Sequence, residues 1–240
     1  MSIEIIPAID ILHGKCVRLT QGDYSSQKIY NEHPLEVAQQ FEDAGLKRLH
    51  LVDLDGAREG RVKNWNVLEQ VAGKTNLIVD FGGGIGSAKD LQIVFDSGAR
   101  FATLGSLAVK DEALLKKWLI QYQADKFILG ADVRDEKISI TGWTVDTEIS
   151  VFDFIENFKT AGVKQIFCTD IHLDGAMKGP SFTLYKKILK RFSDLHFIAS
   201  GGVRSLQDIF ELEEAGCRGV IVGKAIYEGL ITLKELAHVN

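Results

Sequence analysis

The chain has few cysteines, and none of them forms a redox or metal-binding pair. Three occur in 240 residues, at Cys16, Cys168 and Cys217, an odd number without CxxC spacing. This usage argues against a disulfide framework or a zinc knuckle and is typical of a reducing compartment. We therefore expect a cytoplasmic protein, with a core that needs no covalent staples because a chain of this length buries about 70–75% of its unfolded surface.

Segments that would take the protein into a membrane are also missing. The N-terminus has no basic region followed by a long apolar run, and no apolar run reaches the roughly 18 residues of a membrane span. A net charge of −5 disfavours nonspecific binding to nucleic acid, so an anionic ligand must be held by local features. The six histidines show no ligand spacing, and we expect no metal, although aspartates at strand ends are suitable for a hard cation.

The most informative feature that is present is an internal repeat. Residues 83–106 read GGIGSAKDLQIVFDSGARFATLGS and residues 201–224 read GGVRSLQDIFELEEAGCRGVIVGK, with seven of 24 positions identical. FEDAGLKRLHLVD from Phe41 matches FKTAGVKQIFCTD from Phe158 at nearly the same offset. We interpret the chain as one half-unit present twice, about residues 1–120 and 121–240, in a single domain because no linker separates them.

Short apolar, β-branched runs alternate with segments of helical period. Several of the runs are continuously apolar, which is typical of a parallel sheet covered on both faces. The alternation, doubled at half-length, predicts an α/β fold, a (β/α)8 TIM barrel with a twofold internal half-barrel repeat. A doubly wound sheet uses the same alternation, but two like halves close a ring naturally. The expected strands are 3–9, 48–53, 77–80, 101–104, 127–132, 165–169, 196–199 and 219–222, and the expected helices are 34–44, 87–97, 111–122, 150–161, 182–192 and 205–215.

Glycine turns follow four of these strands in duplicated register. A glycine backbone approaches a phosphate closely, and the following helix adds free N–H groups and a partial positive charge. We therefore predict a phosphate site in each half and a ligand with a phosphate at each end. The alternative is that the glycines only permit tight turns between strand and helix. The predicted phosphate-binding residues are Gly83, Gly84, Ser106, Gly202, Gly223 and Lys224.

Asp10 and Asp132 end the first and fifth expected strands, at equivalent positions of the two halves. In a barrel both carboxylates point into the mouth at the C-terminal strand ends, where catalytic groups lie. Two carboxylates there are suited to serve as base and acid. The alternative is that each caps a turn.

Three further residues are candidates at the same rim. Thr169 ends the sixth strand and is placed to bond the substrate or orient Asp132, or it is only a satisfied hydroxyl. Trp143, in the loop beyond the fifth strand, stacks on a flat ring or packs within its loop. Residues 11–33 are too long for a plain connector, so we predict a mobile lid. Within it, Arg18 clamps a phosphate or pairs with Asp23.

The motifs PAIDILHGKCVRLTQGDY, HLVDLDGA, GGGI, GADV, GW and TDIHLDGAMKGP together resemble the phosphoribosylformimino-5-aminoimidazole carboxamide ribotide isomerases of histidine biosynthesis. The likeness covers the whole chain. It implies a barrel that binds a bisphosphorylated small molecule and converts an aminoaldose into an aminoketose by an Amadori rearrangement, without metal or cofactor.

The resemblance also implies roles for individual residues. Asp10 is similar to the proton acceptor, Asp132 to the proton donor and Thr169 to the residue assisting ring opening, while Asp174 is similar to a further carboxylate near the acid. Around these positions the chain departs from the family pattern, with Gly86, Leu173 and Ala176 in place of Arg, Arg and Thr. We expect a monomer.

Three other functions are compatible with parts of this pattern. The sister barrel, the cyclase subunit of imidazole glycerol phosphate synthase, shares the repeat and the aspartates, but its first strand has CLDV where this chain has AIDI. A dual-specificity isomerase that also acts on phosphoribosyl anthranilate would use the same chemistry. A noncatalytic barrel that binds bisphosphorylated ligands or a partner protein is disfavoured by the aspartate pair.

Overall fold

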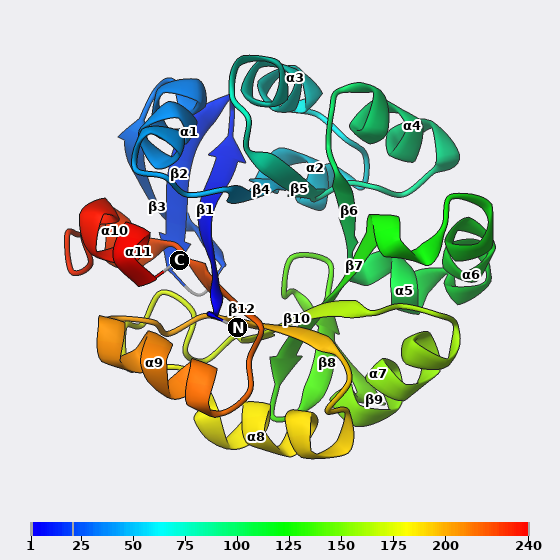
Figure 1. The fold of residues 1–240 in the computed structure, drawn as a ribbon. Coiled ribbons are helices and arrows are strands. Elements are labelled where there is room, and N and C mark those ends of the chain that lie inside the picture. Colours follow the sequence, from blue (N-terminus) through cyan, green and yellow to red (C-terminus); the bar gives the residue numbers. More distant parts are fainter. Residues whose placement is uncertain (1, 21, 240) are drawn as a thin grey trace.

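The computed structural model describes residues 2–20 and 22–239. Eight parallel strands form a closed ring, in which neighbours are paired along the whole circuit and the pairing of β10 with β7 completes it. Figure 1 looks along this ring and shows the helices arranged around its outside. The predicted (β/α)8 barrel is confirmed. The ring strands are β1 (Glu4–Leu12), β4 (Arg48–Asp53), β5 (Ile78–Gly82), β6 (Phe101–Leu104), β7 (Phe127–Arg134), β10 (Gln165–Asp170), β11 (His196–Ser200) and β12 (Gly219–Val222).

Helices connect these strands on the outside. Within the described residues the six predicted helices are present. Further helices that were not predicted lie between β4 and β5, beside the predicted helix between β6 and β7, and after the last strand. The outer elements are α1 (Pro34–Asp43), α2 (Leu54–Glu59), α3 (Trp65–Lys74), α4 (Ala88–Asp96), α5 (Ser106–Lys110), α6 (Glu112–Gln121), η1 (Ala124–Lys126), α7 (Val151–Thr160), α8 (Phe182–Arg191), α9 (Leu206–Glu214), α10 (Lys224–Tyr227) and α11 (Leu233–Val239).

The two copies of the repeat fold in the same way. Ser87 and Ser205 cap α4 and α9 by accepting a hydrogen bond from the backbone N–H three residues on. Gly98 and Gly216 follow these helices, both with φ of +97°, the left-handed conformation that ends a helix at low cost in glycine. The repeated residues therefore provide the same local signals for starting and ending a helix in both halves.

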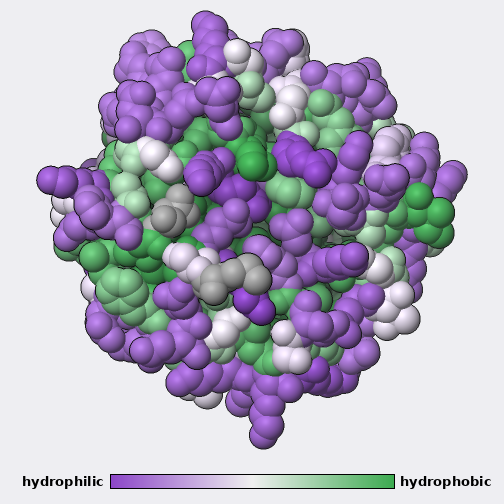
Figure 2. Space-filling view, viewed as in Figure 1, coloured by the Kyte–Doolittle hydropathy of each residue, from purple (hydrophilic) through white to green (hydrophobic). Residues whose placement is uncertain are grey.

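Apolar residues fill both sides of the ring wall. A large cluster lies between strands and helices, and a second one, made only of strand residues, fills the interior of the ring. Along β1 the two clusters alternate, with Ile5 and Ile9 outward and Ile6 and Ala8 inward. Hydrophilic side chains cover most of the face seen in Figure 2. Within the described residues, no helix is long and apolar enough to cross a membrane.

Two antiparallel hairpins extend the ring and were not predicted. β2 (Lys15–Thr20) and β3 (Asp23–Asn31) continue from β1, with Asp10 opposite Val17. β8 (Lys137–Ile140) and β9 (Val145–Ser150) continue in the same way from β7. The segment expected as a lid is thus largely regular β structure, and its mobility stays a prediction. Because β1 and β7 are equivalent strands of the two halves, each half carries one hairpin at the same place.

Candidate active site

The C-terminal ends of the ring strands surround a cavity of about 470 Å³. Every strand of the ring contributes to its wall, so the cavity occupies the position where active sites of such barrels lie. Among the predicted site residues, it is lined by the four catalytic candidates and by Arg18, Gly83, Gly84, Ser106 and Trp143. Each ring strand contributes at least one residue from near its C-terminal end, namely Asp10, Val52, Gly82, Leu104, Asp132, Thr169, Ser200 and Ile221.

Asp132 lies two residues before the end of β7 and has two polar neighbours, both of them candidate site residues. The Trp143 indole and the Thr169 hydroxyl both hydrogen-bond to its carboxylate. Burial nevertheless raises the pKa of Asp132 above its ordinary value, and those two hydrogen bonds and the charge of His50 only partly oppose the rise. Thr169 thus contacts Asp132, and its role in orienting Asp132 stays a prediction.

Asp10, at the other side of the cavity, has a cation beside it. Arg18 Nη1 lies 2.9 Å from Asp10 Oδ2, and both side chains are largely buried. Arg18 thus pairs with Asp10 and not with Asp23, the alternative partner. Asp23 accepts hydrogen bonds from Ser25 instead. Burial acts to lower the pKa of Arg18, but the charges of Asp10 and Asp174 raise it overall, so the guanidinium stays charged. Asp10 thus lies beside the guanidinium of Arg18.

Asp174 differs sharply from its counterpart in the repeat, Asp55. Burial, together with the charges of Asp10 and Asp132, raises the pKa of Asp174 to about 6, although Arg18 acts in the opposite direction. Asp174 is therefore partly protonated near neutral pH.

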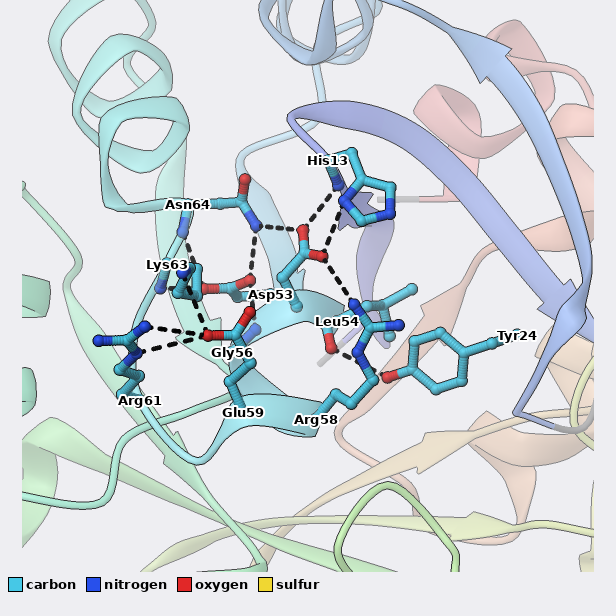
Figure 3. Close-up of polar contacts among 11 residues, drawn as sticks. His13, Tyr24, Asp53, Leu54, Gly56, Arg58, Glu59, Arg61, Lys63 and Asn64 are labelled. Carbon is cyan, nitrogen blue, oxygen red and sulfur yellow. Dashed lines mark hydrogen bonds and ion pairs between the residues drawn. The ribbon is translucent and has the colours of Figure 1, made fainter.

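Asp55 instead makes structural contacts, and its partners His13 and Asn64 are labelled in Figure 3. It accepts hydrogen bonds from the His13 backbone N–H at 2.6 Å and from Asn64 Nδ2 at 3.0 Å. Neighbouring Asp53 accepts from the backbone N–H groups of Gly56 and Asn64. The first-half carboxylates therefore fix the turn after β4 and the tip of the β1–β2 hairpin.

The glycines of the first predicted phosphate turn have a structural reason of their own. Gly83 and Gly84 have φ of +101° and +81°. A Cβ on Gly83 would lie 2.2 Å from the Asp53 carbonyl oxygen, and one on Gly84 2.4 Å from that of Arg61. The alternative explanation, that these glycines permit a tight turn, therefore accounts for part of their presence. The turn still opens into the large cavity, beside Gly105 and Ser106, and the first N–H groups of the helix that Ser106 begins have no partner within that helix.

The second predicted phosphate turn borders a smaller space. Gly202, Gly223 and Lys224 line a separate pocket of about 30 Å³, together with Arg18 and Asp174. Lys224 Nζ donates to the Gly175 carbonyl at 2.8 Å. The Arg18 guanidinium lies so close to Gly223 that a Cβ there would be 2.2 Å from Nη2. The structure therefore brings the two sets of glycine turns to opposite sides of the same mouth. The first set borders the large cavity, and the second borders the narrow pocket.

The two hairpins meet over this mouth. A Cβ on Gly22, at the turn between β2 and β3, would lie 2.7 Å from the Trp143 ring. Trp143 itself lies in the β8–β9 turn with φ of +70°, and both residues line the cavity. The two hairpin turns therefore cover the cavity that Asp10 and Asp132 line.

Comparison with known proteins agrees with this geometry. The sequence model of the family described as "Histidine biosynthesis protein" matches residues 4–232. The chain is 55% identical to a protein of Phocaeicola vulgatus and 56% identical to one of Bacteroides thetaiotaomicron, in each case over 98% of both chains. A protein of Parabacteroides distasonis is 53% identical over the same share. All three are named 1-(5-phosphoribosyl)-5-((5-phosphoribosylamino)methylideneamino) imidazole-4-carboxamide isomerase.

The chain belongs to this histidine biosynthesis family.

Within the family fold, His50 of the cavity wall and its partner Asp80 were not predicted as site residues. His50 lines the cavity and is fixed by Asp80, with Nδ1 and Oδ1 2.5 Å apart. Both are polar residues with an apolar residue on each side, at RLHLVD and IVDFG. That interruption is the signal that identifies them, since a buried polar group needs a partner.

A metal centre is not evident in the parts of the chain that the structure describes, where no three His, Cys, Asp or Glu side chains cluster suitably. The expectation that the reaction needs neither metal nor cofactor remains a prediction.

Proposed function

We propose that this chain is the isomerase its relatives are named for, an aldose–ketose isomerase that performs an Amadori rearrangement in histidine biosynthesis. Asp10 acts as base and Asp132 as acid. The observation that carries the proposal is the pair of buried carboxylates on opposite sides of one cavity, in environments of opposite electrostatic character. Asp10 is paired with Arg18, whereas burial keeps the pKa of Asp132 raised.

The reaction needs one acid and one base acting on the same sugar. Protonation of the ribose ring oxygen by Asp132 opens the ring and leaves a protonated imine at C1′. Asp10 then takes the proton from C2′, which gives an enolamine. Return of that proton from Asp10 to C1′, with loss of the enol hydroxyl proton at C2′ to Asp132, completes the aminoketose and restores both carboxyl groups. No proton is gained or lost overall. A carboxylate beside a cation and a carboxylate whose pKa is raised by burial are suited to this division of roles.

The acid role has a second candidate on the same rim. Asp174, with its pKa raised to about 6, holds a proton at slightly acidic pH and lies between Arg18 and Lys224. We assign the first protonation to Asp132, because Thr169 orients it. To Asp174 we assign a supporting role, in which its charge interacts with the charged groups near it.

The flexible substrate needs anchors on both sides of these carboxylates. We propose that one phosphate binds at Gly83, Gly84 and Ser106, and the other at Gly202, Gly223 and Lys224, with Arg18 beside it. Fixing both ends converts binding energy of remote groups into orientation at the reacting carbon. The pocket at the second site, about 30 Å³, is much smaller than the main cavity of about 470 Å³. We further propose that Trp143 covers the reacting sugar.

Every group in this scheme comes from one chain, which supports a monomer as the working unit. We propose a cytoplasmic enzyme of one domain, built of half-barrels at about residues 1–120 and 121–240, that acts on a bisphosphorylated small molecule and not on nucleic acid or at a membrane. The cyclase alternative is not favoured, since relatives from 50% to 56% identical carry the isomerase name.

The test is an absorbance assay with the aminoaldose ribotide, coupled to a downstream cyclase, and run in parallel with phosphoribosyl anthranilate. We expect turnover of the ribotide. Turnover of both substrates would assign dual specificity. No turnover by a folded protein that binds the ribotide would overturn the proposed function.

A further inference from the structure

A buried histidine–aspartate pair lies on the cavity floor. His50 on β4 and Asp80 on β5 are neighbours across the ring wall, in register with each other and, through β1, with Ala8. Asp80 is fixed from three directions, by His50 Nδ1 at 2.5 Å, by the Thr103 hydroxyl at 3.0 Å and by Arg48 Nη2 at 3.6 Å. The imidazole therefore has one orientation.

The other ring nitrogen of His50 has no protein partner among the described residues. Its side chain is only 9% exposed, and the exposed part faces the cavity that His50 lines. The edge of the ring packs against Phe167, with centroids 5.3 Å apart, which prevents it from swinging away. A largely buried donor without a partner is costly unless a ligand supplies one.

The position of His50 relates it to both proposed catalytic carboxylates. Asp10 lies two residues further along β1 than Ala8, the residue opposite His50, so the imidazole lies one level beneath the base. The charge of Asp10 acts to raise the pKa of His50, and the charge of His50 acts to lower that of Asp132. Burial acts to lower the pKa of His50, but the charge and hydrogen bond of Asp80 outweigh it, so the pKa of His50 is raised above its ordinary value.

We propose that His50 is a substrate-contacting residue of the isomerase, whose Nε2–H donates a hydrogen bond to the oxygen on C2′ of the sugar. This inference rests on the proposed function. After Asp10 removes the C2′ proton, that oxygen changes from an enol hydroxyl to a ketone, and negative charge builds up on it as its own proton leaves. A fixed donor stabilises this change without transferring its own proton, so atoms and charge balance as in the scheme above. Asp80 is the positioning residue that holds the donor.

Two isosteric variants separate contact with substrate from a purely structural role. The amide nitrogen of Asn in H50N occupies a place near Nδ1 and keeps the contact to Asp80, whereas that of Gln in H50Q lies near Nε2 and keeps the donor to the cavity. The matched control is H196Q, because His196 is also a partly buried strand histidine but contacts Glu4 at 3.7 Å and does not line the cavity.

Steady-state kinetics with the aminoaldose ribotide should show kcat reduced about 10- to 100-fold in H50N, the range for one charged hydrogen bond, with KM changed less than about threefold. H50Q should keep most of the lost rate, and H196Q should match the wild-type enzyme. Thermal unfolding of each variant shows whether the barrel is intact.

The inference is overturned if H50N is as active as the wild-type enzyme, or if H50Q is the more damaged of the two, since that order indicates a structural bond to Asp80. An inactive wild-type protein is a different result, which refutes the proposed function itself.

Discussion

Replacing Asp174 by Asn should stabilise the protein, and the gain should depend on pH. The folded-state pKa of Asp174 is about 6, against an ordinary value of 3.8. A group whose pKa is raised on folding contributes stability that is present below its unfolded pKa and is lost as the pH rises through the folded one. At about 1.4 kcal/mol per pKa unit the loss above pH 6 is at most about 3 kcal/mol. Because Asp174 borders the open cavity, solvent screening should reduce this to about 1–2 kcal/mol.

The assay is thermal and denaturant unfolding of wild type and D174N between pH 4 and pH 8. We expect D174N to have a melting temperature higher by about 2–8 °C at pH 8, with the difference shrinking through pH 6 and vanishing near pH 4. Activity should fall in the same variant, since a destabilising group retained in a cavity is there for function.

The repeat supplies the matched control, D55N. Asp55 accepts hydrogen bonds from His13 and Asn64, so its replacement should destabilise by about 1–3 kcal/mol at pH 8. Substitution of equivalent aspartates is thus expected to change stability in opposite directions. A D174N variant less stable than wild type at pH 8, or a gain that does not vary between pH 4 and 8, would refute the reasoning.

Three other perturbations test the site. D10N and D132N should each reduce turnover by about 10²–10⁴-fold while calorimetry still detects ligand binding, and an active double variant would exclude the acid–base scheme. G84A should be destabilised by several kcal/mol more than G45A, because a Cβ at Gly84 meets the Arg61 carbonyl whereas Gly45 has φ of +89° and nothing within 4 Å; equal melting temperatures would show that the turn yields. W143F removes a hydrogen bond that lowers the pKa of Asp132, so the alkaline limb of kcat/KM should move to higher pH, and an unmoved limb would exclude Asp132 as its source.

The barrel was predictable because short local sequence patterns indicate its strands and helices. The β12 run GVIV is buried at every position, and the caps at Ser87 and Ser205 mark where helices start. The hairpins gave no such signal. β3 is largely exposed along its length, so it has no buried face from which to read a period, and its strand character comes from pairing with β2.

The site was predictable only as far as strand ends determine it. Asp10 and Asp132 lie near the C-terminal ends of β1 and β7, and a closed ring places them at the same mouth. The partner of Arg18 could not be predicted from the sequence, because the register of β2 against β1 decides that Asp10 and not Asp23 lies beside it. The His50–Asp80 pair likewise depends on which residues of two strands face each other, which neither strand specifies alone.

The contact between Gly22 and the Trp143 ring has a consequence for how such a duplicated protein can be divided. Each half contributes one hairpin, and the enclosure exists only where the tip of one touches the tip of the other. A separately produced half would keep its own glycine turn but would leave its carboxylate open to bulk water. Two such fragments should therefore regain protection of the sugar only on reassembly, so the ring, and not the half, is the smallest unit that shields the reaction.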